Sequence, residues 1–462
     1  MSSEHNGLPL PARYWAILTI ALAISMAVLD GAIANVALPA IAHDLNASPA
    51  ASIWVVNAYQ LATTVSLLAF ASLGDIYGYR RIYQIGLAVF TLTSVLCALS
   101  DSLMTLTIAR ILQGFGASAL MSVNTALVRL IYPKQQLGRG MAINSLVVAL
   151  SSAAGPTIAA GILSVASWQW LFAINLPLGV LAFVIAMKAL PGNSHKATHG
   201  FDLKSALLNA ATFGLLIFSI DGLGHNANRP LVLAMLMVSL AVGYVFVRRQ
   251  LTLAAPMLPV DLLRIPVFAL SICTSICSFS AQMLAMVALP FYLQETLNFS
   301  ATQTGLLLTP WPLAIVVTAP LAGRLVEKKY SPGMLGGIGL AVFSVGLLLL
   351  GLLPANPTHL DIIWRMTLCG IGFGFFQSPN NFAILSSAPA HRSGGASGML
   401  GTARLVGQTV GASLVALMFG LFGQNGTRSS LLIAAVFAIC AAGVSFMRMA
   451  GGVHAAQASK AG

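Results

Sequence analysis

The sequence predicts an all-α polytopic membrane protein, and three observations support this prediction. Only 7% of the 462 residues are charged, and 58% are apolar, whereas a soluble globular protein carries about 25% charged residues. Uninterrupted apolar runs recur along the whole chain, each near the length of about 20 residues that a helix needs to cross a bilayer. Such runs exclude intrinsic disorder, which requires low hydrophobicity, and disfavour a β-barrel, whose strands alternate polar and apolar residues.

Fourteen apolar runs are candidates for transmembrane helices. In chain order they lie at 14–38, 54–73, 82–99, 103–127, 141–165, 171–189, 205–224, 230–247, 266–290, 302–323, 333–353, 361–384, 397–422 and 430–448. With the N-terminus inside, eighteen Lys and Arg residues fall on the inner side and three on the outer side. Cytoplasmic loops carry such an excess, so we predict that both termini are cytoplasmic. The net charge of +12 then reflects topology, and we expect no nucleic-acid partner.

The polar connection after the sixth run divides the predicted helices into groups. Six runs precede it, two follow with few distinctive polar groups, and six more complete the chain. Repeated halves around a central site are a common transporter design. We therefore expect a six-helix bundle, a cytoplasmic linker, an inserted helix pair and a second six-helix bundle, at residues 1–190, 191–204, 205–249 and 250–462.

The cysteines give no sign of a disulfide framework or a metal site. All five lie in apolar runs, and an odd number buried in spans does not form a set of bridges. Cys273 and Cys277 share a helix face, but neither His nor a carboxylate accompanies them. We therefore expect no metal.

Several short motifs lie at defined places in the predicted topology. The loop after span two reads L-G-D-I-Y-G-Y-R-R over residues 73–81, and span one contains L-D-G-A-I-A-N-V-A-L-P over residues 29–39. Span four has the spacing L-x-x-x-R-x-x-Q-G-x-G-A over residues 106–117, span five has G-P at Gly155 and Pro156, and W-Q-W-L-F-A-I-N-L-P-L-G over residues 168–179 opens span six.

Together these motifs make the chain similar to the major facilitator superfamily, and within it to the fourteen-helix drug:proton antiporters. The resemblance extends over nearly the whole chain. It implies the major facilitator fold, in the form of two six-helix bundles plus an inserted pair, and a multi-pass location in the bacterial inner membrane. It also implies export of small molecules driven by the proton gradient, with no cofactor. We expect a monomer whose partners are its substrate, protons and the lipid bilayer.

Two of the motifs suggest moving parts. In the inner loop, Asp75, Gly78 and Arg80 match the superfamily's signature, and an Asp–Arg pair beside a glycine turn can act as a conformational latch between adjacent helix ends. In span five, Gly155 and Pro156 are accompanied by small residues. Small residues allow close helix approach and Gly-Pro bends a helix, so we expect a bent helix at a tight interface.

Asp30 and Arg110 are the candidates for proton coupling. A charge deep in a bilayer costs about 2.5–3.5 kcal/mol on insertion scales, so each needs a reason to be there. Asp30 lies about 24 Å along span one from the inner side and Arg110 about 10 Å along span four from the outer side, which places them at similar depth. The two side chains could pair, directly or through Gln113 or Asn35. A carboxylate of this kind could take up and release a proton during the transport cycle. Alternatively, the pair could serve only to fix the register of the two helices.

Other polar residues within spans are weaker candidates. For the substrate cavity they are Asn35, Asn57, Tyr59, Gln60, Gln113, Asn124, Asn144, Gln282 and Trp311. For a gate in the second half they are Gln377, Asn380, Asn381, Arg404 and Gln408. Ordinary helix packing is the competing interpretation for each of them.

Two functions remain after the other classes are weighed. The sequence contains no H-E-x-x-H motif and no carboxylate pair on one helix face, so nothing indicates a membrane enzyme. It also contains no G-x-x-x-x-G-K-[ST] motif, so nothing indicates an ATP-driven pump. We expect a proton-coupled exporter of drugs or toxic lipophilic compounds, and a lone acidic site in an apolar cavity favours cationic ones. The alternative is a proton-coupled exporter or symporter of an endogenous metabolite on the same fold.

Overall fold

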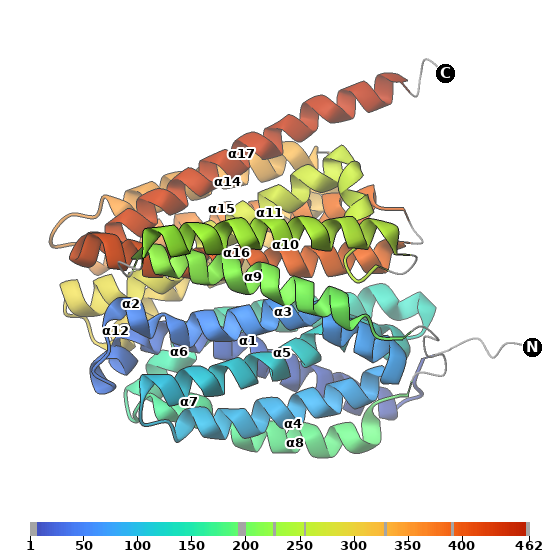
Figure 1. Cartoon of the computed structure of the whole chain (residues 1–462), viewed down its shortest axis with the longest axis horizontal. Coiled ribbons are helices and arrows are strands. Elements are labelled where there is room, and N and C mark those ends of the chain that lie inside the picture. Colours follow the sequence, from blue (N-terminus) through green and yellow to red (C-terminus); the bar gives the residue numbers. More distant parts are fainter. Residues whose placement is uncertain are drawn as a thin grey trace, which may run out of the picture.

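The structure is a computed structural model, and in the residues it describes every regular element is a helix, which confirms the predicted fold class. These residues are 7–192, 200–224, 228–253, 256–327, 330–389 and 392–458. The helices run side by side along one axis, and α1 (Ala12–Asp44) begins at the same end of the bundle at which α17 (Gly426–Ala458) ends (Figure 1). We call this the inner end and the opposite end the outer end, following the predicted topology.

The first half of the chain supplies six spans, two of which are broken into a short and a long helix. After α1 come α2 (Pro49–Ser52), α3 (Trp54–Tyr77), α4 (Tyr79–Ala98), α5 (Leu103–Ile131), the 3₁₀ turn η1 (Lys134–Gln136), α6 (Leu137–Leu163), α7 (Gln169–Ala173) and α8 (Asn175–Ala189). The hydroxyls of Ser48 and Ser102 accept from the backbone N–H of Ala51 and Thr105, each at 3.2 Å. Such caps satisfy first-turn amides and fix where α2 and α5 begin.

The rest of the chain forms the inserted pair and the second half. The elements are α9 (Leu203–Gly224), α10 (Arg229–Thr252), the 3₁₀ turn η2 (Val260–Arg264), α11 (Pro266–Phe291), the π-helical turn η3 (Tyr292–Thr296), α12 (Ala301–Leu308), α13 (Pro310–Glu327), α14 (Pro332–Gly351), α15 (His359–Ser387), α16 (Ser393–Phe422), the 3₁₀ turn η5 (Gly423–Asn425) and α17. The predicted run 302–323 is interrupted at Thr309, because Pro310 opens a new helix and a proline cannot donate to the preceding turn.

By length and composition, thirteen helices within the described residues could cross a membrane. The predicted run 361–384 corresponds to α15, which is too polar to be counted with them because it contains Arg365, Gln377, Asn380 and Asn381. Its 29 residues are nevertheless long enough to span. It packs against α11, α13 and α14, its Asn380 is buried, and by its length α15 is the candidate for the fourteenth span.

The two halves are joined at the outer end and have separate cores at the inner end. One apolar cluster contains Val36 and Ile41 of α1 together with Leu293 and Leu308 of the second half. At the inner end, the cluster of the first half and the cluster around Phe268 in the second half are distinct. The division into bundles stays a prediction. It is supported by these two cores, because each half has its own core at the inner end.

The inserted pair lies against both halves on one side of the bundle, with α9 and α10 across the front in Figure 1. α9 contacts α3 and α16. The Asn209 amide donates to the Val65 carbonyl at 2.8 Å, and the Trp54 indole donates to Asp221 at 3.0 Å. Both bonds tie α9 to α3 of the first half.

Candidate functional site

A buried ion pair between Asp30 of α1 and Arg110 of α5 forms the centre of the candidate site. Neither side chain is exposed at all, and Nη1 of Arg110 donates to Oδ2 of Asp30. Of the arrangements that similar depth allowed, the structure shows the direct pair. An ion pair without solvent must be satisfied by further hydrogen bonds to be tolerated, and the surrounding residues supply them.

Two amide side chains complete the coordination of the pair. Gln113 accepts from Nη1 of Arg110 at 2.6 Å and donates to Oδ1 of Asp30 at 2.9 Å. Asn175, at the start of α8, donates to the same carboxylate oxygen at 3.2 Å, and Nε of Arg110 donates to the Val55 carbonyl at 3.0 Å. Both carboxylate oxygens are thus held by donors from different helices.

A second layer surrounds these groups. The Ser94 hydroxyl accepts from Gln113 at 2.8 Å and from Asn175 at 3.3 Å, and the Cys97 thiol lies 3.4 Å from the Gln113 oxygen. The guanidinium carbon of Arg110 lies 4.2 Å from the centre of the Tyr59 ring and 5.5 Å from that of Phe172, within the range of a cation–π contact. Within the described part of the chain, Nη2 of Arg110 is buried without a hydrogen-bond partner.

Four residues of this site are absent from the sequence-based candidates. Asn175 and Phe172 lie in the W-x-W-x-F-x-I-N motif, so the motif itself was a signal that these positions face something specific. Ser94 and Cys97 carried no signal, because small polar residues occur throughout these helices and can satisfy themselves on the preceding turn. Asn35 does not take the linking position suggested for it: its side-chain oxygen is buried without a partner among the described residues.

The remaining cavity candidates fall into three groups. Tyr59 donates to the Ala27 carbonyl at 3.1 Å, and Asn124 donates to Asn144 at 2.9 Å, so these side chains hold helices together. Asn57 and Trp311 are fully buried, with polar atoms that lack a partner within the described residues. The third group comprises Gln60 and Gln282. Their side chains have no hydrogen-bond partner among the described residues, but their polar atoms are accessible.

The second-half candidates separate in the same way. Asn380 is fully buried and binds Arg448, which donates to its side-chain oxygen at 2.7 Å and to the Ser271 hydroxyl at 2.8 Å. Asn380 in turn donates to Ser275 at 2.8 Å, so it belongs to a packed network between α11, α15 and α17. The others are half-buried, and none has a hydrogen-bonding protein partner in the described chain: Gln377, Asn381, Arg404 and Gln408.

The inner loop forms a tight turn between α3 and α4. Gly78 has φ +108° and ψ 132°, a conformation that is essentially restricted to glycine. Asp75 accepts from the Tyr79 hydroxyl at 2.6 Å, and Arg80 donates to the Met187 carbonyl of α8. In this structure Asp75 joins α3 to α4, and Arg80 joins α4 to α8. The two side chains do not pair with each other, and their action as a latch stays a prediction.

Gly155 and Pro156 lie where α6 meets its neighbours. A Cβ on Gly155 would be 2.5 Å from the Cβ of Ala32 on α1, and a Cβ on Gly305 would be 2.4 Å from the Pro156 carbonyl oxygen. These glycines allow α6 to approach both α1 of its own half and α12 of the other half. The expected tight interface is present, and its role in a helix bend stays a prediction.

Hydrogen bonds join the two halves at the outer end. Gln294 on η3 donates to the Val36 carbonyl of α1 at 3.0 Å. The hydroxyls of Thr157 and Thr309 lie 2.8 Å apart, and Thr302 donates to the Ala160 carbonyl at 3.3 Å. These contacts link α1 and α6 to η3, α12 and α13, and they accompany the shared apolar cluster.

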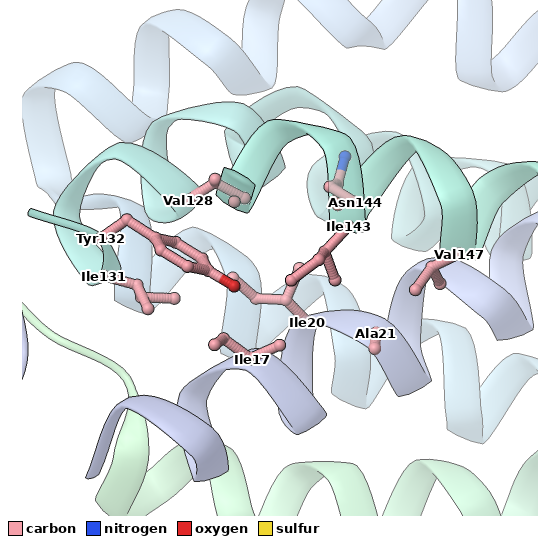
Figure 2. A pocket seen from close by; sticks show the side chains of 10 residues that line it. Ile17, Ile20, Ala21, Val128, Ile131, Tyr132, Ile143, Asn144 and Val147 are labelled. Carbon is pink, nitrogen blue, oxygen red and sulfur yellow. The ribbon is translucent and has the colours of Figure 1, made fainter. Parts of the chain in front are cut away.

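A small cavity of about 20 Å³ lies between the inner ends of α1, α5 and α6 (Figure 2). Its lining is apolar apart from Asn144 and Tyr132, and the Tyr132 hydroxyl has no partner among the described residues. This volume suits about one water molecule and is far below the roughly 300–1,000 Å³ of a site for a drug-sized ligand. In this conformation the cavity is too small for a drug-sized ligand.

Comparison with known sequences gives a consistent assignment. The sequence profile of the Major Facilitator Superfamily matches residues 20–412 and 270–460. An uncharacterized transporter of Escherichia coli K12, YebQ, is 64% identical over 96% of this chain and 98% of its own length. The riboflavin transporter RibZ of Clostridioides difficile is 30% identical over 88% of both chains, and the multidrug efflux pump LfrA of Mycolicibacterium smegmatis is 30% identical over 89% of this chain and 82% of its own.

Solved structures support the same fold. A POT family transporter in complex with a thioalcohol-conjugated peptide superposes with a TM-score of 0.73 at 15% identity, over 96% of each chain. A bacterial homologue of the lysosomal transporter Spinster, in an inward-facing and unoccupied conformation, superposes with a TM-score of 0.66 at 14% identity, over 95% of this chain and 97% of its own.

Proposed function

The chain belongs to the Major Facilitator Superfamily and is a multi-pass membrane transporter, and we propose that it is a proton-coupled exporter of drug-like lipophilic compounds that works by alternating access. The observation that carries the proposal is the fully buried Asp30–Arg110 pair. Its carboxylate is held by the amides of Gln113 and Asn175, and Nη2 of Arg110 has no partner among the described residues. We place it as a monomer in the bacterial inner membrane, driven by the proton gradient without a cofactor.

Protonation of Asp30 would change the balance of this network. A neutral carboxyl no longer compensates Arg110, and a buried unpaired charge is strongly unfavourable. Gln113 and Asn175 both donate to Oδ1 of Asp30, and the carbonyl oxygen of a neutral carboxyl still accepts such bonds, so the contact that is lost is the one from Arg110 to Oδ2. Proton uptake therefore favours a displacement of α1 relative to Arg110 on α5.

The same helix carries this shift to the contact between the halves. Val36, which accepts from Gln294 of the second half, lies six residues beyond Asp30, about 9 Å along α1. A displacement of α1 at Asp30 therefore acts on the outer contact. In this structure the carboxylate has no exposure, so protons reach it only in another conformation, as an alternating-access cycle requires.

The proposed substrate class is supported by fewer observations than the proposed coupling to protons. The drug pump LfrA among the relatives supports export of lipophilic compounds, and the riboflavin transporter RibZ supports the alternative of an endogenous metabolite. A cationic substrate stays a prediction, and the structure lends it no support, because Arg110 already occupies the buried carboxylate.

The test is uphill transport in proteoliposomes that contain the purified chain under an imposed pH gradient. A panel of the dyes ethidium and fluorescein, with riboflavin for the alternative function, would be followed for wild type, Asp30→Asn and the control Asp101→Asn, which changes an exposed aspartate. We expect Asp30→Asn to lose uphill transport and to keep dye-for-dye exchange, while the control behaves as wild type.

Two results would contradict parts of this proposal. An Asp30→Asn variant that still accumulates dye against its gradient would show that the pair is only structural. A wild-type chain that moves riboflavin but neither dye would favour the metabolite carrier.

A further inference from the structure

The deep charges of this chain are unevenly divided between its halves. Among the described residues, the buried charged side chains are Asp30, Arg110 and Arg448, and Arg404 is half-buried within α16. Asp30 and Arg110 neutralise each other in the first half. Within the described chain, no carboxylate lies within 4.0 Å of Arg404 or Arg448. The interior of the second half therefore carries uncompensated positive charge.

Arg448 is satisfied without a ligand. Its Nη1 donates to Ser271 and Asn380, its Nη2 donates to the Ser445 hydroxyl, and its Nε lies 3.4 Å from the Ser445 carbonyl. All three nitrogens have acceptors from the packed helices. This arginine is part of the protein's own framework, and its hydrogen bonds leave little for an incoming group.

Arg404 is in the opposite situation. None of its nitrogens has a hydrogen-bond acceptor among the described residues, and Nε is buried without a partner. Its guanidinium carbon lies 5.6 Å from the centre of the Phe279 ring of α11, which orients the group but satisfies no donor. An unpaired ionisable group within a membrane span marks a functional position by default.

The place of Arg404 on α16 suits a substrate contact. Gly401 and Thr409 face α3 of the first half, with the Thr409 and Thr64 hydroxyls 2.9 Å apart. Gly407 faces α11, where a Cβ would lie 2.6 Å from the Ile276 carbonyl oxygen. On a helix with 3.6 residues per turn, Arg404 lies between these two sides, and Gln408 is one turn further on the same face.

We propose that Arg404 binds the anionic group of the transported compound, with Gln408 as a second polar contact and Phe279 holding the guanidinium in place. The substrate class is a lipophilic compound that carries a carboxylate or phenolate oxygen. The planar guanidinium presents paired N–H donors that match a carboxylate, and the neighbouring Leu405, Ala403 and Phe279 are buried apolar residues. This inference rests on the proposed transport function and names its substrate class.

The test compares an anionic and a cationic dye on the purified full-length chain in detergent. Equilibrium binding of fluorescein and of ethidium would be measured by fluorescence anisotropy for wild type, Arg404→Gln, Arg404→Lys and the control Arg428→Gln, which removes an exposed arginine. Since a hydrogen bond to a charged group contributes about 1.5–3 kcal/mol, we expect fluorescein to bind about tenfold or more weakly to Arg404→Gln. Arg404→Lys retains part of the affinity, the control retains all of it, and ethidium binding is not weakened in any variant.

Two outcomes would overturn this inference. The first is an Arg404→Gln variant that binds fluorescein with unchanged affinity. The second is a wild-type protein that binds ethidium but not fluorescein, and this result does not depend on whether a variant folds. Transport in proteoliposomes separates the two proposals. If fluorescein binds through Arg404 but is never moved against its gradient, the proposed export function is wrong while the anionic site stands.

Discussion

The side-chain amide of Gln294 donates a hydrogen bond to the backbone carbonyl of Val36 at 3.0 Å, and these residues belong to different halves of the chain. Gln294 lies on the π-helical turn that follows α11, and Val36 lies near Pro39 in α1. The bond therefore fastens the outer ends of the first helices of the two halves to each other.

We predict that Gln294→Leu shifts the chain away from this closed outer end. The net worth of one hydrogen bond is about 1 kcal/mol, so the conformational equilibrium should change about fivefold. The paired cysteines Thr157→Cys and Thr309→Cys report on it, because the two hydroxyls lie 2.8 Å apart. Oxidative cross-linking should be efficient in the wild-type background and reduced with Gln294→Leu. Chains that carry only one of the two cysteine substitutions give the background signal from the five natural cysteines. Equal cross-linking in both chains would contradict the prediction.

Breaking the buried ion pair should destabilise the protein more than removing it. Asp30→Asn leaves Arg110 buried and unpaired, which typically costs about 3–5 kcal/mol. The double variant Asp30→Asn, Arg110→Gln removes both charges and should recover most of the loss in thermal melting of the purified chain. It should not recover uphill transport. A double variant that is as unstable as the single one would mean that the two residues are not energetically coupled.

Two glycines of α6 form a matched pair for testing the helix interface. A Cβ on Gly155 would lie 2.5 Å from Ala32 Cβ, whereas a Cβ on Gly161 would meet nothing within 4 Å. Overpacking of this kind costs about 1–3 kcal/mol, so Gly155→Ala should lower the melting temperature and the transport rate. Gly161→Ala should leave both nearly unchanged or slightly raise stability. Equal effects of the two substitutions would show that α6 is free to move away from α1.

The inserted pair should show a pH dependence through Asp202. Desolvation alone would raise the pKa of this carboxyl, but hydrogen bonds from Ser205 and Arg249 outweigh it and leave the pKa below its ordinary value. A carboxyl with a lowered pKa stabilises the fold fully above its unfolded pKa of about 3.9, and this contribution is lost as the pH falls through the folded value. Hydrogen exchange of α9 and α10 should therefore be slower in wild type than in Asp202→Asn at neutral pH, and the difference should vanish in acid. A difference that does not change with pH would contradict this explanation.

Helix positions were predictable because apolar runs and spans have similar lengths. The run 230–247 lies within α10, and the run 333–353 lies within two residues of both ends of α14. The end of α1 was not predicted: the run stops before Pro39, yet the helix continues to Asp44. One lost hydrogen bond at a proline is outweighed there by packing, since Ile41 is completely buried.

The centre of the candidate site was predictable, but its surroundings were not. Depth along two helices placed Asp30 and Arg110 at the same level, because each deep charge needs a partner, but it did not decide between a direct pair and a link through Gln113 or Asn35. Arg448 shows the limit of that reasoning. Its place at the end of a run assigned it to the inner loops, whereas the structure buries it to 5% exposure against Asn380. Charge patterns locate the ends of spans but not the direction in which a terminal side chain folds.

The position of α9 makes the two sides of the transporter unequal toward the lipid. α9 lies where α3 of the first half meets α16 of the second and packs against both. Its Asn209 amide donates to the Val65 carbonyl of α3, and its Asp221 accepts from the Trp54 indole of α3. A lipophilic molecule that approaches from within the bilayer thus meets a covered seam on this side. The opposite seam, where α6 meets α12 and α13, lies away from the inserted pair.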